Sequence, residues 1–68
     1  MSEIVLLVED APEGGLTARA LGASIFTEAD TLNALRETVR DAVACHIDDA
    51  ERPKLIRLHL VRDEVISA

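Results

Sequence analysis

The stretch that decides the fold is Ile4-Val5-Leu6-Leu7-Val8, a short apolar run rich in β-branched residues. Runs of this length form strands more often than helices, and apolar residues on both faces favour a central position in a sheet. The following residues 9–15, Glu-Asp-Ala-Pro-Glu-Gly-Gly, are typical of a turn. Pro and Gly end the strand and reverse the chain, so the next run is expected to lie beside the first.

Three further runs predict the other strands of this sheet. Residues 16–21 alternate in polarity and predict a second strand, after which Gly22 permits another tight reversal. Residues 23–27 predict a short third strand, and residues 54–62 predict the last one. The apolar side chains of the last strand share one face, and they are Ile56, Leu58 and Leu60.

One amphipathic helix is predicted between the third and the last strand. Residues 32–47 carry an apolar stripe at steps of three and four, made of Leu32, Leu35, Val39, Ala42, Val43, His46 and Ile47. Asp30 or Thr31 is expected as the N-cap, because either side-chain oxygen accepts a hydrogen bond from the free amides of the first turn. Residues 48–53, Asp-Asp-Ala-Glu-Arg-Pro, end the helix.

These elements predict an α+β fold of strand-strand-strand-helix-strand order. A helix with one apolar stripe covers one face of a sheet, which gives a two-layer β-β-β-α-β sandwich with one helix on a four-stranded mixed sheet. The helix is the crossover that lets the last strand lie parallel beside the first. Residues 1–68 are therefore predicted to form a single domain.

Composition narrows the class of partner. Seven basic and 13 acidic residues give a net charge of −6, which argues against direct nucleic-acid binding and suits a basic protein. Cys45 is the only cysteine, so we expect a protein of the reducing cytoplasm. The run Ile4–Val8 is too short to span a membrane. A 68-residue chain that is 49% hydrophobic should also leave apolar surface for a homo-oligomer.

No recognised catalytic or metal-binding pattern appears. Cys45 and His46 are adjacent on the helix and point about 100° apart, so they do not form a nucleophile pair. A metal site joining either of them to His59 is an alternative, but these residues lack a ligand spacing. Glu9 and Asp10 close the first strand, where turn formation explains them more simply than catalysis. We therefore expect no enzymatic activity, no cofactor and no metal.

Two groups of residues are predicted to bind a partner. The first should project from the sheet face opposite the helix, and comprises Arg19, Arg57 and His59, with Leu7, Leu55 and Val61 beside them. A face that mixes apolar and Arg side chains is typical of a protein interface, although packing against a second copy would use it equally well. The second group is acidic and comprises Asp48, Asp49 and Glu51. These form either a solvated loop or a contact to a basic partner.

Two motifs also carry a family resemblance. Residues 13–22 read Glu-Gly-Gly-Leu-Thr-Ala-Arg-Ala-Leu-Gly, and residues 27–32 read Thr-Glu-Ala-Asp-Thr-Leu before the helix. Over residues 4–47 this succession resembles the HicB family of antitoxin-like proteins. The resemblance implies a partial ribonuclease-H-like fold without the nuclease's acidic cluster. HicB proteins usually carry a C-terminal DNA-binding domain, for which residues 1–68 leave no room, so a short form without repressor function is expected.

The resemblance also implies a function. It predicts an antitoxin-like protein-binding module that neutralises a small basic HicA-type RNA-cleaving toxin by covering its active site. The alternative hypothesis is an orphan homo-oligomeric or regulatory subunit without catalytic activity. A third hypothesis, a small enzyme, would require that replacing Asp10, Cys45, His46 or His59 abolish an activity without unfolding the protein.

Overall fold

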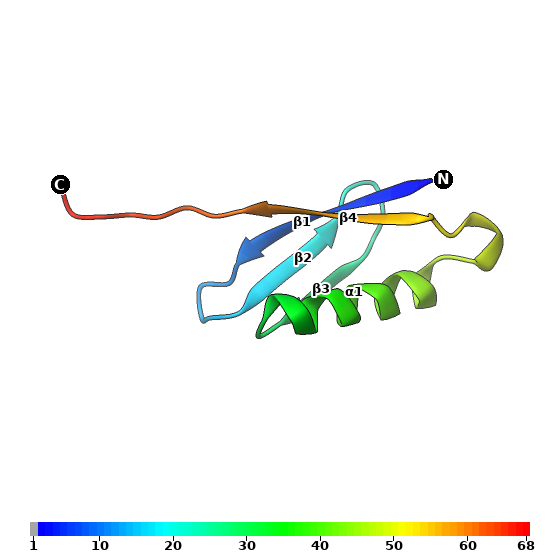
Figure 1. The fold of residues 1–68 in the computed structure, drawn as a ribbon, viewed down its shortest axis with the longest axis horizontal. Coiled ribbons are helices and arrows are strands. Elements are labelled where there is room, and N and C mark those ends of the chain that lie inside the picture. Colours follow the sequence, from blue (N-terminus) through cyan, green and yellow to red (C-terminus); the bar gives the residue numbers. More distant parts are fainter. Residues whose placement is uncertain (1) are drawn as a thin grey trace.

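The computed structural model describes residues 2–68 and has the predicted order of strands and helix (Figure 1). The elements are β1 (Glu3–Asp10), β2 (Leu16–Ala20), β3 (Phe26–Ala29), α1 (Leu32–His46), the 3₁₀ turn η1 (Asp49–Glu51) and β4 (Leu55–Val61). None of the helices that these residues form is both long enough and apolar enough to cross a membrane. The α+β class predicted from the sequence is confirmed.

The sheet has the order β3-β2-β1-β4, which places β1 inside it as its apolar sequence predicts. β2 lies antiparallel to β1, with Leu6 opposite Ala20. β4 lies parallel to β1 on the other side, with Leu6 opposite Leu58. The helix is the crossover between β3 and β4, so the predicted parallel pairing of the first and last strands is also confirmed.

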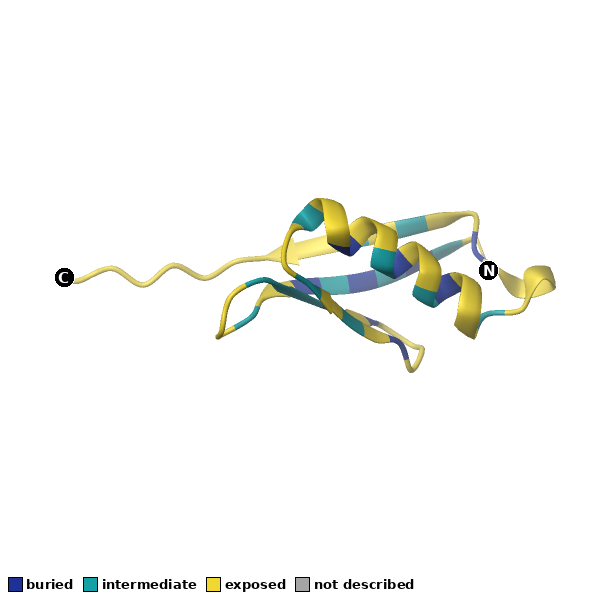
Figure 2. Ribbon diagram, turned by 90° about the horizontal axis from the view of Figure 1, so that it is seen from below, coloured by how far each residue is buried: buried dark blue, intermediate teal, exposed yellow. Residues whose placement is uncertain are grey.

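The core lies between α1 and one face of the sheet (Figure 2). Side chains alternate along a strand, so every second residue of β1 faces the helix, and Leu6 is fully buried there. The apolar stripe of α1 meets this face through Leu35, Val39 and Val43. His46, which sequence analysis placed on the same stripe, is exposed at the last turn of the helix.

Both ends of α1 are held by side chains. Thr31, one of the two predicted candidates, is the N-cap, and its Oγ1 accepts a hydrogen bond of 3.1 Å from the backbone N–H of Ala34. At the other end, Arg52 Nη2 donates to the Ala44 carbonyl at 3.1 Å and pairs with Asp49 Oδ1 at 2.8 Å. The guanidinium thus satisfies a helix carbonyl that has no partner within the helix.

The predicted bounds of the first and third strands were wrong, and those of the other elements agree to within one residue. The third strand was expected at residues 23–27 but begins at Phe26, because Ala20 N–H donates to Ile25 O at 2.9 Å and closes a longer reversal. Glu9 and Asp10 were assigned to the first turn but belong to β1, because β2 and β4 flank β1 and extend its pairing beyond Val8. The turn itself is shorter and begins at Ala11.

Candidate protein-binding surface

The sheet face opposite α1, called the open face below, is covered by no other element of residues 2–68 (Figure 2). Strand register aligns its side chains in rows that run across the sheet. The central row crosses all four strands and consists of Phe26, Arg19, Leu7 and His59. Phe26 is 65% exposed, although aromatic side chains usually contribute to a core or to an interface. The central row is therefore the best candidate for contact with a partner.

The rows on either side differ in charge. In one row, Val5 lies opposite Arg57, and Leu21 joins them because its N–H donates to the Val5 carbonyl at 2.9 Å. Arg57 Nε donates to the carboxylate of Glu3, and the Arg57 side chain stays 64% exposed beside this carboxylate. The other row contains Glu28, Thr17, Glu9 and Val61. The central row, which mixes apolar and basic side chains, is thus bordered by carboxylates on the β1–β2 turn side.

The structure separates the two groups of residues that the sequence predicts for partner binding. Arg19, Arg57 and His59 all lie on the open face, which confirms their predicted position, while their binding role stays a prediction. The acidic residues Asp48, Asp49 and Glu51 instead lie in and before η1, at the end of the molecule where α1 stops and β4 starts (Figure 1). A partner that contacts both groups must therefore reach around this end of the sheet.

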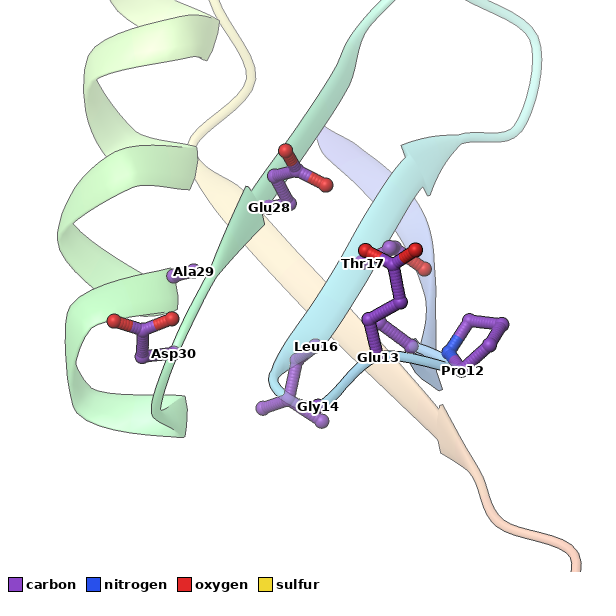
Figure 3. Close-up of a pocket in the computed structure, with 9 residues that line it drawn as sticks. Pro12, Glu13, Gly14, Leu16, Thr17, Glu28, Ala29 and Asp30 are labelled. Atoms are coloured by element: carbon purple, nitrogen blue, oxygen red, sulfur yellow. The ribbon is translucent and has the colours of Figure 1, made fainter.

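A shallow depression lies between the β1–β2 turn and the junction of β3 with α1 (Figure 3). Glu13, Glu28 and Asp30 contribute carboxylates to its lining. Within residues 2–68, however, no group of three His, Cys, Asp or Glu side chains is arranged to hold a metal ion. The depression is best explained as the seam where the two motifs of the family resemblance meet.

Gly15 accounts for part of that seam. It adopts a φ of +80°, and a Cβ built at this position would lie 2.7 Å from the carbonyl oxygen of Ala29. Only glycine lets the turn pack this closely against the end of β3. Gly14 also has a positive φ of +103°, but a Cβ there would meet no atom within 4 Å. Packing against the end of β3 therefore explains the glycine at position 15, whereas Gly14 is explained by its backbone conformation alone.

The residues considered for catalysis are not brought together. Cys45 is exposed on α1, and His46 Nδ1 lies 3.0 Å from the Ala42 carbonyl of its own helix. His59 projects from the open face, on the opposite side of the sheet from α1. Asp10 accepts hydrogen bonds from Arg62 at 2.9 and 3.3 Å, and this contact raises the pKa of the Arg62 guanidinium. That ion pair joins the end of β1 to the chain beyond β4.

Sequence analysis missed Phe26, Leu21 and Glu28 as open-face residues. The run Ala-Ser-Ile-Phe-Thr over residues 23–27 places two large apolar residues side by side, and alternation alone does not say which one faces the core. The register between β2 and β3 shows which of the two faces the core, because Phe26 lies opposite Arg19 while Ile25 is buried. The available signal was Arg19 on the neighbouring strand β2, because a charged side chain indicates the exposed face and Phe26 lies opposite it.

Comparison with known proteins gives two similar sequences. A UPF0150 protein of Archaeoglobus fulgidus is 56% identical over 52 residues, covering 76% of this chain and 77% of the relative. A UPF0150 protein of Thermotoga maritima is 37% identical over 65 residues, covering 96% of this chain and 91% of the relative. No family model and no solved structure matches the chain.

Proposed function

The chain belongs to the UPF0150 protein family, and we propose that this member is an antitoxin-like protein-binding module. Its target is a small basic HicA-type ribonuclease, which it neutralises by covering the active site. The observation that carries this proposal is the open face, where Phe26 is exposed at the β3 end of the central row. The resemblance of the two motifs to the HicB family supplies the class of target.

The composition of the open face supports protein binding. Interfaces are enriched in aromatic and Arg side chains, and a few such residues carry most of the binding energy. Phe26 and Arg19 are neighbours in the central row, beside Leu7. Leu21 and Leu55 add apolar area, since they are 52% and 62% exposed. These residues can contact a partner without disturbing the core, which lies on the other side of the sheet.

Charge supports a basic partner. The net charge of −6 attracts a basic protein over distances of about 10 Å and speeds its association. Glu9 and Glu28 border the central row of the face, where they can pair with basic residues at the rim of an interface. The acidic residues of the η1 segment offer a second, separate contact for the same target.

A cleavage assay tests the proposal. A purified HicA-type ribonuclease is mixed with rising amounts of the chain, and the rate at which it cleaves a labelled RNA is measured. We expect cleavage to fall to background at one chain per ribonuclease, because a covered active site no longer admits RNA. An unchanged cleavage rate at tenfold excess of the chain would contradict the proposed function.

Two single-residue variants test whether the open face is the surface that binds the ribonuclease. Phe26→Ala should weaken affinity for the ribonuclease by at least about tenfold, as expected when a large exposed aromatic side chain contacts the partner. Asp41→Ala is the control, because Asp41 is exposed on α1, on the other side of the sheet. Equal losses for both variants, or no loss for Phe26→Ala, would remove the open face from the interface.

The acidic segment has its own test. Replacing Asp48, Asp49 and Glu51 with Asn, Asn and Gln removes three negative charges but leaves the open face unchanged. If this segment contacts the basic target, binding should weaken and depend less on salt concentration. Unchanged affinity and an unchanged salt dependence would assign the contact to the open face alone.

The alternative function is an orphan homo-oligomeric or regulatory subunit without catalytic activity. One observation favours self-association, namely the long unpaired edge of β4. Recovery of only the bait, as an oligomer, in a tagged pull-down would support this alternative. Recovery of a small basic ribonuclease in stoichiometric amount would support the antitoxin.

A further inference from the structure

A second surface lies along the outer edge of β4. β4 and residues 62–68 together form one extended ribbon that projects beyond the rest of the sheet (Figure 1). The molecule is consequently long and thin, with extents of 51 × 18 × 18 Å. Val65 and Ile66 in the projecting part are 94% and 79% exposed. Two large apolar side chains therefore stand in a segment that makes little contact with its own domain.

The backbone of β4 has hydrogen-bonding groups that point outward from the sheet. Leu55 N–H donates to the Ser2 carbonyl at 3.0 Å, so the odd-numbered residues of β4 direct their N–H and C=O groups toward β1. The even-numbered residues Ile56, Leu58 and Leu60 direct theirs away from the sheet. An exposed edge of this kind is a template for pairing with another chain. The opposite edge, β3, has only four residues and offers much less.

We propose that two copies of this chain pair antiparallel along the ribbon 55–68, around a twofold axis at Leu60. The two four-stranded sheets then join into one continuous sheet. Leu60 lies opposite Leu60 of the second copy. Residues at equal distances before and after Leu60 are partners, so residue 59 of one copy lies opposite residue 61 of the other. This alignment uses the outward-pointing backbone groups of the even-numbered residues, as antiparallel pairing requires.

The ribbon is complementary to itself in this register. On the open-face side, Arg57 lies opposite Asp63 of the second copy, and Leu55 lies opposite Val65 of the second copy. Lys54 is a diagonal neighbour of Glu64 of the second copy on the α1 side. The cations precede the carboxylates in the sequence, so antiparallel pairing brings opposite charges together. Parallel pairing would place like charges side by side.

The α1 side of the ribbon also has room for the second copy. The helix packs mainly over β2 and β3, so Leu60 on β4 remains 54% exposed although it points to the helix side. Between α1 and β4 runs a groove whose rim carries the cations Arg36, Arg40 and Lys54. In the proposed register, Ile66 of the second copy reaches the mouth of this groove, and the carboxylate of Glu64 lies near its cations.

These observations favour a second copy over a foreign strand, because the matching charges and apolar residues all come from the ribbon itself. The proposal does not rest on toxin binding. It leaves the open face available, since pairing through the edge extends the sheet without covering either face. A dimer would present two open faces on one continuous sheet.

Sedimentation velocity tests the dimer. The wild-type chain should sediment with twice its monomer mass of 7.4 kDa at micromolar concentration. Leu60→Pro removes an outward-pointing N–H at the axis, and Val65→Asp with Ile66→Asp places charges on the exposed segment. Each should raise the dissociation constant at least tenfold without unfolding the domain, as circular dichroism will verify.

Two results would overturn the proposal. One is a wild-type chain that stays monomeric up to roughly 1 mM, the upper end of weak association. The other is a dimer whose dissociation constant is the same in Leu60→Pro, in the Val65 and Ile66 variant and in wild type. A monomer whose Leu60→Pro variant loses affinity for the ribonuclease would assign the edge to the toxin, and would overturn the dimer as well.

A charge exchange tests the register. Asp63→Lys should weaken the dimer about tenfold, because it places Lys opposite Arg57 of the second copy at two symmetric positions. Asp41→Lys makes the same change in net charge on the exposed side of α1 and should weaken nothing. Adding Arg57→Glu to Asp63→Lys should restore affinity. Failure of that rescue, or equal effects of the two Lys variants, would refute this register.

Discussion

The two faces of the sheet come from alternate residues of the same strands, yet they hold very different shares of the folding free energy. Every strand residue of 2–68 that is buried points toward α1, as Leu6 does, whereas Leu7 next to it lies on the open face and is only half-buried. The comparison teaches that one face holds the domain together and leaves the other available for contact. The following predictions are ordered from the largest expected effect to the smallest.

The neighbours Leu6 and Leu7 give the most direct test of this difference. Leu6→Ala should lower the free energy of unfolding by about 2–5 kcal/mol, because it leaves a cavity where the side chain is 0% exposed. Leu7→Ala should cost less than half as much, since water already reaches that side chain. Urea unfolding followed by circular dichroism measures both. Similar losses for the two variants would show that the open face also carries the fold.

Substitutions of Gly14 and Gly15 test the packing of the β1–β2 turn at the end of the sheet. Gly15→Ala should destabilise by roughly 2–3 kcal/mol, combining the strain of a positive φ with overlap against the Ala29 carbonyl. Gly14→Ala meets no atom and should cost only the strain, roughly 1–2 kcal/mol. Thermal unfolding of the two variants separates these costs. A Gly14 variant as unstable as the Gly15 variant would contradict the close packing of the seam.

Removing the N-cap at the start of α1 should lower the free energy of unfolding by a moderate amount. Thr31→Ala removes the N-cap acceptor for Ala34 N–H and should cost about 1 kcal/mol. Thr38→Ala is the matched control, because Thr38 Oγ1 donates to Ala34 O within the helix and Ala is a better helix former. Its denaturation midpoint should equal or exceed that of the wild type. A larger loss at Thr38 than at Thr31 would contradict this assignment of the cap.

The smallest effect on stability is expected on the open face itself. Phe26→Ala removes a side chain that is 65% exposed, so the free energy of unfolding should change by only about 0.5 kcal/mol. The same variant is expected to lose affinity for the ribonuclease. A stability loss comparable with that of Leu6→Ala would mean that Phe26 serves the fold, and its exposure would then need another explanation.

Much of the fold could be predicted because its signals are local. The apolar run Ile4–Val8 indicates a central strand without reference to any other residue, and the spacing of Leu35, Val39 and Val43 indicates the buried side of the helix. Residue type and place before the helix predicted the cap to be Asp30 or Thr31, and the hydrogen bond from Ala34 N–H selects Thr31. Charge and composition predict a basic partner protein, and this partner stays a prediction.

The remainder depends on pairing between strands, which no single segment specifies. The start of β3 at Phe26 follows from the hydrogen bond between Ala20 and Ile25, and this bond sets the length of the reversal. The same register decides that Phe26 faces outward. Likewise, Glu9 and Asp10 become strand residues because neighbouring strands continue past the apolar run. Local polarity suggested a turn, and tertiary pairing overrode it.

The uncovered sheet face has a consequence for the evolution of the family. Substitutions at positions such as Phe26, Arg19 or His59 change the surface while leaving the packing beneath α1 untouched. Because most harmful mutations act through lost stability, these positions can vary with little penalty to the fold. Relatives can therefore change this surface one substitution at a time. One scaffold of this size can thus present many different surfaces while its interior sequence stays constrained.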